Sequence, residues 1–408
     1  MRIGVISIGS ELLIGHTVNT NLAYIGEQLA AAGFTVDREV CIPDLPPVME
    51  ETMRQELAAA ELVITIGGLG PTRDDLTRDI AARVMGAELR EEATVRRHIE
   101  QYLGPRLPII PPTALQVQSR VPVGATAILN HNGTAPGLWC PCEGRTLVLL
   151  PGPPRELQPM FESEIMPRIR QLADPDRYRR SLRLYGIPEA AAAEKLESSI
   201  ELPAEVEIAY CARAGEIDVR LTALPELAPR VDQIIEEIRL LFSSAALPES
   251  TDLVGAVANL LKLRRLSLAL AESCTGGLIA GAITDRAGAS EFFHGSIVCY
   301  SNQSKQQLLG VPGKVLEQHG AVSQETALAM ATGAQRQMAA DCAIAVTGIA
   351  GPGGGTVDKP VGLVYIATAV KDQVRAKAHH FNGHRERIRA RAVTAALDSL
   401  RIHLDTEP

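Results

Sequence analysis

The chain has 408 residues, of which 46% are hydrophobic, 22% charged and only 3% aromatic. This composition is typical of soluble globular domains, and the length predicts two to four of them, with cores of Ala, Val, Ile and Leu. The net charge of −8 argues against coating of nucleic acid by the whole chain, and no apolar stretch approaches the roughly 20 residues that a membrane span requires.

The seven cysteines are scattered, and the chain starts directly with an apolar segment that lacks the features of a signal peptide. We therefore expect reduced thiols and a cytoplasmic location. Cys140 and Cys142 lack the second pair, or the nearby histidines, of a zinc finger, so we expect no zinc there.

The first 90 residues alternate predicted strands and helices. Strands are expected at 3–8, 35–40 and 62–66, and helices at 19–32, at 48–60 and after residue 75 as far as residue 85. This βαβαβ order predicts a parallel, doubly wound sheet, which binds ligands beyond the carboxyl ends of its strands. Two loops occupy that position, Gly9 to Glu11 after the first strand and Gly67 to Asp75 after the third.

The middle of the chain is less regular. Residues 100–150 are rich in proline and end in an expected hairpin of 137–139 with 146–150, after which 151–156 opens another helix. The segment 164–183 is basic, and strands at 181–185, 206–211 and 216–223 with helices at 189–200 and 227–241 predict a small α+β module. A basic segment beside such a module is compatible with RNA binding, but the solvated arginines of a connector explain it as well.

A second α/β domain is predicted after a weak linker at 243–250. Its expected helices are 253–263, 278–283, 323–338 and 385–400, and its expected strands are 267–271, 295–300, 343–347 and 362–370.

Ser273 is the candidate nucleophile of this last domain. With Cys274 and Thr275 it lies in a glycine-flanked turn between a strand and a helix, where backbone N–H groups face a ligand. A serine needs a base, and Lys305 can act as one if burial beside Tyr300, at a strand end, lowers its pKa. Cys274 is the alternative nucleophile, although a thiol usually needs a histidine partner. A polar helix cap and a surface lysine are the structural alternatives.

Other segments of the last domain suggest a phosphorylated substrate. Residues 347–355 form a glycine-rich turn after a strand, and Arg385 and Arg389 share one face at the start of the final helix. Glycine amides and guanidinium groups recognise phosphate, so we expect a small phosphorylated amide or ester.

The first domain has a second candidate site in the segment 67–77. Its glycines permit close approach of the backbone to a pyrophosphate, and Asp74 and Asp75 offer oxygen ligands to a divalent metal that bridges it. Glu11, on the facing loop, could add a ligand or act as a base. The alternative is that the two aspartates only cap a helix and interact with its dipole.

Several motifs together resemble the CinA family. In the last domain these are AESCTGG (271–277), YSNxxK (300–305), GAVS (320–323), TGIAGPGGG (347–355), KPVG (359–362) and the arginine-bearing final helix. In the first domain, the segment 67–77 resembles the GGTGxxxxD signature of molybdenum-cofactor biosynthesis domains, with Leu69 in place of the usual threonine. GSELLxGxxxNTN (9–21), NxxGTAPG (130–137) and LPGPPRE (150–156) are similar to the CinA version.

The resemblance implies a molybdopterin-binding-like domain at 1–168, a KH-like connector at 169–246 and a nicotinamide mononucleotide amidohydrolase domain at 247–408. For the last domain it implies that Ser273 attacks the nicotinamide carboxamide and that Lys305 is the general base, with no cofactor. Tyr300 and Thr347 would line the site. From the chemistry we expect further substrate contacts from Thr275, Gly276, Gly351, Gly353, Gly354, Arg385 and Arg389.

For the first domain the resemblance implies metal-dependent cleavage of the pyrophosphate of ADP-ribose. A divalent cation of uncertain identity would be held by Asp74, Asp75 and Glu11. The expected substrate contacts are Gly67, Gly68, Gly70, Thr72 and Ser10.

Two alternatives stay open. The first domain could bind a pterin or a nucleotide without hydrolysing it. The protein could also be a nucleic-acid-associated competence factor, which the net charge and the lack of an evident GxxG loop in the connector disfavour. The resemblance alone implies a homodimer.

Overall fold

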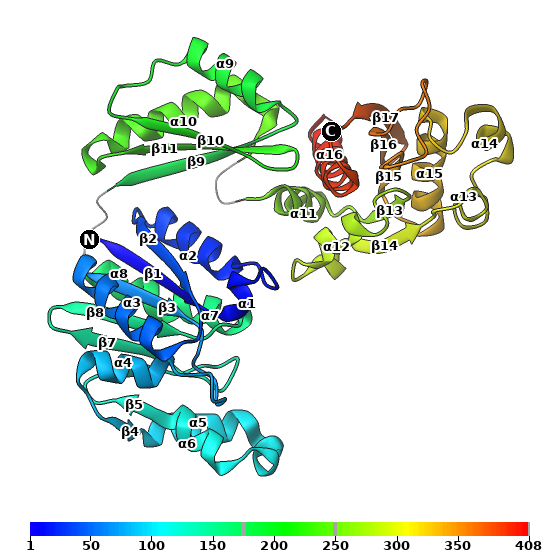
Figure 1. Cartoon of the computed structure of the whole chain (residues 1–408). Helices are drawn as coiled ribbons and strands as arrows, with labels where there is room; N and C mark the ends of the chain where they lie inside the picture. Colours follow the sequence, from blue (N-terminus) through cyan, green and yellow to red (C-terminus); the bar gives the residue numbers. More distant parts are fainter. Residues whose placement is uncertain (173–176, 248–250, 407–408) are drawn as a thin grey trace. The chain divides into compact units, whose positions relative to one another are not determined.

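Figure 1 shows the computed structural model of the chain, which describes residues 1–172, 177–247 and 251–406. It divides into two compact units, Met1–Arg179 with Ala223–Ala228, and Arg180–Thr222 with Pro229 onward. Within the described ranges, no helix combines the length and the apolar composition needed to cross a bilayer. The cysteines are all free.

A mixed sheet with the strand order β2-β1-β3-β8-β7-β6 forms the centre of the first unit. Parallel pairing joins β1 (Ile3–Ile8), β2 (Val36–Ile42), β3 (Leu62–Ile66) and β8 (Arg145–Leu150). The expected hairpin adds β7 (Gly137–Cys142) next to β8, and β6 (Thr126–Ile128) follows, both antiparallel. The prediction of an α/β fold with a doubly wound first sheet is confirmed, and β1 and β3 are buried throughout.

Helices cover both faces of this sheet. Because side chains alternate along a strand, Ile3 and Val5 face one apolar cluster, whereas Ile6 and Ile8 face the other. The first cluster packs against α2 (Thr20–Ala31), α7 (Pro154–Met160), a π-helical turn (Phe161–Ile165) and α8 (Met166–Leu172). The second packs against α3 (Pro46–Ala59), α4 (Thr77–Met85), α5 (Ala93–Leu103) and α6 (Pro112–Ser119).

The structure adds elements that the sequence does not predict. It has α5, which contains no proline, before and at the start of the expected proline-rich segment. A 3-10 helix (Gly104–Ile109) and α6 follow within that segment, and each has proline in its first turn, where proline fits without losing a hydrogen bond. Two short strands, β4 (Leu89–Glu91) and β5 (Arg120–Pro122), pair beside them. The expected loop after β1 contains a short helix, α1 (Ser10–Leu13).

The predicted α+β module is a sheet with the order β10-β11-β9-β12 and two long helices. The expected linker is partly wrong, because Ala246 and Leu247 form β12 and pair with β9; its residues 248–250 lie outside the described part of the chain. Arg168 pairs with Glu164 and Arg180 with Asp232, so these arginines of the basic segment have protein partners. The elements are β9 (Tyr178–Tyr185), α9 (Glu189–Ser199), β10 (Glu207–Ala212), β11 (Glu216–Ala223), a 3-10 turn (Pro225–Leu227), α10 (Ala228–Phe242), a 3-10 turn (Ser243–Ala245) and β12 (Ala246–Leu247).

The last domain, from residue 251 on, is built on a sheet with the order β14-β13-β15-β16-β17. The strands β14 (Phe293–Val298), β13 (Leu268–Glu272) and β15 (Cys342–Gly348) are parallel, and β16 (Leu363–Val370) and β17 (Gln373–His380) are antiparallel. In Figure 1, α16 and α15 lie on opposite sides of this sheet. One face packs against α11 (Leu253–Arg264), α12 (Leu278–Thr284), a 3-10 turn (Ala289–Glu291) and α16 (Arg385–Thr406), and the other against α13 (Asn302–Leu309), α14 (Gly313–His319) and α15 (Gln324–Gln337).

Candidate functional site

The parallel strands of the last domain end at one edge of the sheet, and a cavity of about 190 Å³ lies there. Ser273 follows β13 directly, Thr347 lies near the end of β15, and the segment after β14 contributes Tyr300 and Lys305. Loops that leave neighbouring parallel strands at such an edge commonly form a binding site. Together with Arg385, these four predicted residues line the cavity.

Ser273 and Lys305 are in contact. The Lys305 Nζ atom lies 3.1 Å from Ser273 Oγ and 2.8 Å from the carbonyl oxygen of Cys299. Lys305 is only 1% exposed, and this desolvation lowers the pKa of its amine. When neutral, the amine can donate a hydrogen bond to the Cys299 carbonyl and accept the hydroxyl proton of Ser273. The two side chains therefore have the arrangement of a nucleophile and its base.

Lys305 lies in the first turns of α13, and not at a strand end as the sequence suggests. Ser301 caps this helix by accepting a hydrogen bond from the Ser304 N–H at 3.1 Å, while the Ser304 hydroxyl accepts one from the Ser301 N–H at 3.0 Å. This capping box fixes where the helix begins and thereby where the lysine points. The serines between Tyr300 and Lys305 are thus a helix-start signal that the sequence interpretation misses.

Buried Glu272 holds the turn that carries Ser273. Its carboxylate accepts hydrogen bonds from three backbone N–H groups at the start of α12, at 2.9 to 3.2 Å, and from the Ser296 hydroxyl at 3.0 Å. A carboxylate at this place satisfies N–H groups that have no partner within the helix. Gly276 and Gly277 have φ values of 61° and 94°, which glycine adopts without strain.

Cys274 also lines the cavity, but its thiol is not activated. The residue is buried, and desolvation raises the pKa of the thiol to about 11 even though Arg389, Lys305 and Arg385 act in the opposite direction. The thiol is therefore protonated at neutral pH. Between the two candidate nucleophiles, this environment favours Ser273.

The two arginines predicted to bind phosphate have different surroundings. Arg385 lines the cavity and donates to the Gly351 carbonyl at 2.7 Å and to the Tyr300 hydroxyl at 3.3 Å. Arg389 is outside the lining and donates to the carbonyl oxygens of Cys274 at 3.0 Å and Thr275 at 2.7 Å. Its guanidinium group therefore holds the backbone of the turn that carries Ser273.

Other predicted contacts of the last domain do not reach the cavity. Outside its lining are Thr275, Gly276, Gly351, Gly353 and Gly354. The Gly351 carbonyl accepts the hydrogen bond from Arg385.

The loops beside this cavity are tied to each other. The Thr347 hydroxyl donates to the Ala321 carbonyl at 2.6 Å, and Lys359 Nζ donates to the His319 carbonyl at 2.6 Å. Lys359 thus connects the KPVG segment to the C-terminal end of α14, a role that its position in the motif does not reveal.

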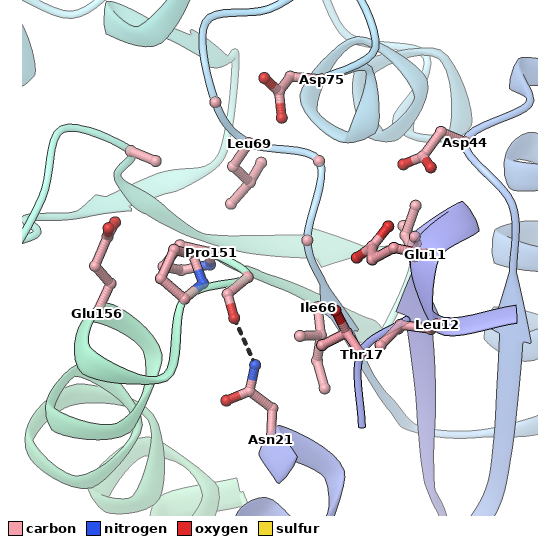
Figure 2. A pocket seen from close by; sticks show the side chains of 18 of the residues that line it. Glu11, Leu12, Thr17, Asn21, Asp44, Ile66, Leu69, Asp75, Pro151 and Glu156 are labelled. Carbon is pink, nitrogen blue, oxygen red and sulfur yellow. Dashed lines mark hydrogen bonds between the residues drawn. The ribbon is translucent and has the colours of Figure 1, made fainter. Parts of the chain in front are cut away.

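A larger cavity, of about 620 Å³, lies beyond the carboxyl ends of β1, β3 and β8 in the first unit (Figure 2). Gly67, Gly68 and Gly70 all line it, as predicted. The φ values of Gly67 and Gly68 are 103° and 68°, and a Cβ atom at Gly67 would lie 2.5 Å from the Ile8 carbonyl oxygen. A Cβ atom at Gly68 would collide with the Thr77 hydroxyl, so only glycine fits this loop.

Arg78 supports the backbone of this glycine loop, a role that the sequence does not indicate. Its guanidinium group donates to the carbonyl oxygens of Leu69 and Val117, each at 2.9 Å. Complete burial lowers the pKa of Arg78 to about 10, which still leaves it charged at neutral pH. Leu69 is buried against the core, at the position where the molybdenum-cofactor signature has threonine.

The charged side chains in the described lining of this cavity are all carboxylates. Figure 2 shows Glu11 and Asp44 on the opposite side from Glu156. Among the lining residues that the structure describes there is no Lys, Arg or His, so a bound phosphate would need a cation to balance its charge. Carboxylate oxygens are the donors that Mg²⁺ shares with substrate phosphates. The carboxylate-bearing residues of the lining are Glu11, Asp44, Asp74, Asp75 and Glu156.

The predicted metal ligands and substrate contacts differ in their placement. Glu11, Asp74 and Asp75 line the cavity, but the described ranges contain no group of three or more His, Cys, Asp or Glu side chains arranged to hold an ion. No side chain caps α4, so neither aspartate caps that helix. Ser10 and Thr72 lie outside the lining; Ser10 donates to Asp44 at 2.9 and 3.1 Å, and the Thr72 N–H donates to Asp75 at 2.8 Å.

Family models match three successive parts of the chain. These are the probable molybdopterin binding domain at residues 4–171, the damage-inducible protein CinA KH domain at 179–241 and the CinA C-terminal domain at 250–404. The CinA-like protein of Akkermansia muciniphila is 41% identical over 417 residues, which cover 100% of this chain and 99% of that protein. The CinA-like protein of Citrifermentans bemidjiense is 40% identical over 407 residues, with coverages of 100% and 98%.

A solved structure is similar to part of the chain. The competence/damage inducible protein CihA of Agrobacterium tumefaciens shares 42% sequence identity over a region that covers 38% of this chain and 97% of that one, with a TM-score of 0.37.

Proposed function

The chain belongs to the CinA family, and from this premise we propose that its last domain hydrolyses the carboxamide of nicotinamide mononucleotide to nicotinate mononucleotide and ammonia. The observation that carries the proposal is the 3.1 Å contact between Lys305 Nζ and Ser273 Oγ at the cavity. A buried amine with a lowered pKa is the base that an unassisted serine needs.

The reaction proceeds through an acyl-enzyme. Neutral Lys305 takes the hydroxyl proton of Ser273 as Oγ attacks the carboxamide carbon. The C–N bond then breaks, and the Lys305 ammonium group gives that proton to the leaving nitrogen, which departs as ammonia. Water attacks the resulting ester, its proton passes to Lys305 and then to Ser273 Oγ, and nicotinate mononucleotide leaves.

The surroundings of the serine fit this substrate class. A cavity of about 190 Å³ accepts a pyridine carboxamide, whereas the ribose phosphate extends beyond it. Tyr300 is largely exposed at the cavity, and its ring can contact the positively charged pyridinium. Arg385, which lines the cavity from the start of α16, is the cation available to the phosphate.

The test is ammonia release from nicotinamide mononucleotide by the full-length chain and three variants. We expect Ser273→Ala and Lys305→Ala to lose activity by roughly a thousandfold or more, while Cys274→Ala keeps most of it. Activity that survives in Ser273→Ala and disappears in Cys274→Ala would assign the nucleophile to the thiol. Absence of ammonia release by the unaltered chain would refute the proposed reaction.

For the first domain we propose metal-dependent cleavage of the pyrophosphate of ADP-ribose. The proposal is supported by the glycine loop Gly67–Gly70 beside carboxylates, in a cavity whose described lining contains no basic side chain. Because Glu11, Asp74 and Asp75 are not gathered into a three-ligand site, one or two of these carboxylates would hold a divalent cation together with the substrate phosphates. When bound, it would balance the charge of the pyrophosphate and activate water.

AMP release from ADP-ribose, measured with and without a chelator, tests this second activity. We expect Asp74→Asn to lower the rate at least roughly a hundredfold. The matched control is Glu88→Gln, which changes an exposed carboxylate of the same unit. Tight binding of ADP-ribose without AMP release would instead support the non-catalytic binding module.

A further inference from the structure

A buried arginine lies directly behind the glycine loop Gly67–Gly70 of the first cavity. Arg78 is in the first turn of α4 and is 0% exposed. Its guanidinium group binds two backbone carbonyl oxygens, those of Leu69 in the loop and of Val117 in α6, each at 2.9 Å. Arginine is almost never completely buried unless a carboxylate pairs with it, because an unpaired buried charge is costly. Its presence here indicates a function beyond packing.

The acidic groups near Arg78 are engaged elsewhere. Asp79 pairs with Arg120 at 3.4 Å. Asp75 lines the cavity and accepts a hydrogen bond from the Thr72 N–H at 2.8 Å. In the part of the chain that the structure describes, no ion pair includes Arg78, although these charged groups are near enough to act on its pKa. The positive charge of the guanidinium group is therefore available to an anion in the cavity.

The start of α4 turns the carbonyl groups of the loop away from the cavity. The Gly67 carbonyl accepts a hydrogen bond from the Thr77 hydroxyl at 2.8 Å. The Leu69 carbonyl accepts the hydrogen bond from Arg78. Both peptide units are trans, and in a trans peptide unit the N–H points opposite to the C=O. The N–H groups of these two units therefore point away from α4.

Gly68 and Gly70 carry these two N–H groups. Both residues are partly exposed and line the cavity, and a glycine exposes only backbone. Neither N–H group has a hydrogen-bond acceptor among the described residues. Backbone N–H groups without a protein partner bind water or a ligand, and those of glycine-rich turns form concavities that bind anions. The loop thus offers two donors to the cavity, with a buried cation behind them.

The charge of Arg78 reaches a ligand through the loop, without contact. Peptide geometry places the guanidinium group roughly 5 Å from the Gly70 nitrogen, and roughly 8 Å from an oxygen that this nitrogen binds. At that distance, with an effective dielectric constant of about 20, attraction between two unit charges favours binding by roughly tenfold to a hundredfold. Because the described lining contains no basic side chain, this buried group offers from behind the loop a positive charge that the lining lacks.

We propose that Arg78 is a positioning residue for the pyrophosphate of the substrate, which orients the Gly70 N–H toward a phosphate oxygen and places a positive charge behind it. The inference rests on the proposed function of the first domain and adds to it a residue that acts on the ligand without touching it. Thr77 has only the orienting part of this role, because its hydroxyl is neutral.

The experiment measures binding of the methylene analogue of ADP-ribose, in which CH₂ replaces the bridging oxygen of the pyrophosphate and prevents turnover. Its dissociation constant for the full-length chain is measured by calorimetry with Mg²⁺ present. Arg78→Gln removes the charge and keeps a donor for one carbonyl, so we expect the affinity to fall roughly tenfold to a hundredfold. Arg90→Gln, which alters an exposed arginine of the same unit, is the matched control and should leave the affinity unchanged.

A pH series on Arg78→Lys separates the charge from the packing. At pH 6.5 this variant should bind more tightly than Arg78→Gln. Burial lowers the pKa of a lysine, so the introduced amine loses its charge as the pH rises to 9, and the affinity should fall over this range. The unaltered chain keeps its guanidinium charge and should show no such fall. Thr77→Val should weaken binding equally at every pH, because it affects only orientation.

Circular dichroism and thermal unfolding show whether each variant is folded, and the pH series of Arg78→Lys decides if Arg78→Gln does not fold. Folded Arg78→Gln that binds as tightly as the unaltered chain would overturn the inference. So would Arg78→Lys that binds no better than Arg78→Gln at pH 6.5 and is insensitive to pH, because the arginine would then only pack. An unaltered chain that does not bind the analogue refutes this inference, whereas one that binds it but releases no AMP from ADP-ribose refutes only the proposed cleavage.

Discussion

At the scale of single residues, burial of Lys305 would set the pH range of the reaction proposed for the last domain. The amine must be neutral to take the proton of Ser273, and desolvation lowers its pKa below the ordinary value of about 10.4. We therefore expect kcat/KM for ammonia release to rise with pH as this amine deprotonates, with an apparent pKa below that of a free lysine. A pH profile from 6 to 11 measures it. A rise centred on the ordinary lysine value would contradict the effect of burial.

The same burial makes a prediction for stability. Because the pKa of Lys305 is lower in the folded state than in the unfolded state, the unfolded chain binds more protons between the two values, and the free energy of unfolding falls as the pH decreases through that range. Lys305→Met removes this dependence. We expect the stability of this inactive variant, relative to the unaltered chain, to be more favourable at pH 7 than at pH 10. Urea unfolding at both pH values measures the difference, and an equal difference at both would contradict the argument.

Arg389 and Arg385 lie one turn apart on α16, yet we expect their loss to affect different kinetic constants. Arg389 binds the Cys274 and Thr275 carbonyls, so Arg389→Met should lower kcat by roughly tenfold to a hundredfold with little change in KM, because the turn that carries Ser273 is misplaced. Arg385→Met should chiefly raise KM for nicotinamide mononucleotide. Steady-state kinetics of the two variants is the measurement. A raised KM in Arg389→Met would show that this arginine binds the phosphate after all.

At the scale of elements, the start of α12 depends on one buried carboxylate. Glu272→Gln keeps the shape of the side chain but directs an amide N–H at backbone groups that also donate. We expect a loss of about 3 kcal/mol in the free energy of unfolding, measured by urea denaturation. Glu291→Gln, which alters an exposed carboxylate paired with Lys262, is the control and should change stability by less than about 0.5 kcal/mol. An equal effect of the two variants would contradict the role given to Glu272.

The elements that the sequence predicts well are those with a clear periodic pattern. The strands β1 and β3 and the helix α2 are continuous or regularly spaced apolar segments, and the structure has them within one or two residues. The antiparallel edge strand β17 was not predicted, because its only apolar residues are Val374 and two alanines among charged and polar ones, which gives a weak strand signal. The short helices α13 and α14 show too few apolar positions for a periodic pattern, and only the capping serines mark the first of them.

Some residues of the candidate sites could likewise be predicted from the sequence, and others could not. The positions of Ser273 and of Gly67 follow from the rule that loops at the carboxyl ends of parallel strands bind ligands, so sequence order is enough to find them. The hydrogen bond of Asn21 to Gly152 joins residues that lie 131 positions apart, and such a pairing depends on how α2 and α7 pack. The role of Arg78 could not be predicted from the sequence. Its guanidinium group binds backbone carbonyl oxygens, which every residue has, so no particular type of partner residue indicates the interaction.

At the scale of the whole molecule, the two proposed activities lie in different compact units and use different chemistry. The first cavity combines carboxylates with a described lining that contains no basic side chain, whereas the second has a buried lysine beside a serine. In the two proposed reactions, a metal ion would therefore serve the first, whereas the second would move its protons with side chains alone.

This separation predicts how a chelator acts on one preparation of the full-length chain assayed for both products. EDTA should abolish AMP release from ADP-ribose and leave ammonia release from nicotinamide mononucleotide unchanged, because the mechanism proposed for Ser273 and Lys305 uses no ion. Ser273→Ala should do the reverse. Restoring Mg²⁺ after chelation controls for damage to the protein. If EDTA stopped both reactions and Mg²⁺ restored both, the last domain would also need an ion, and the two-residue mechanism proposed for it would be incomplete.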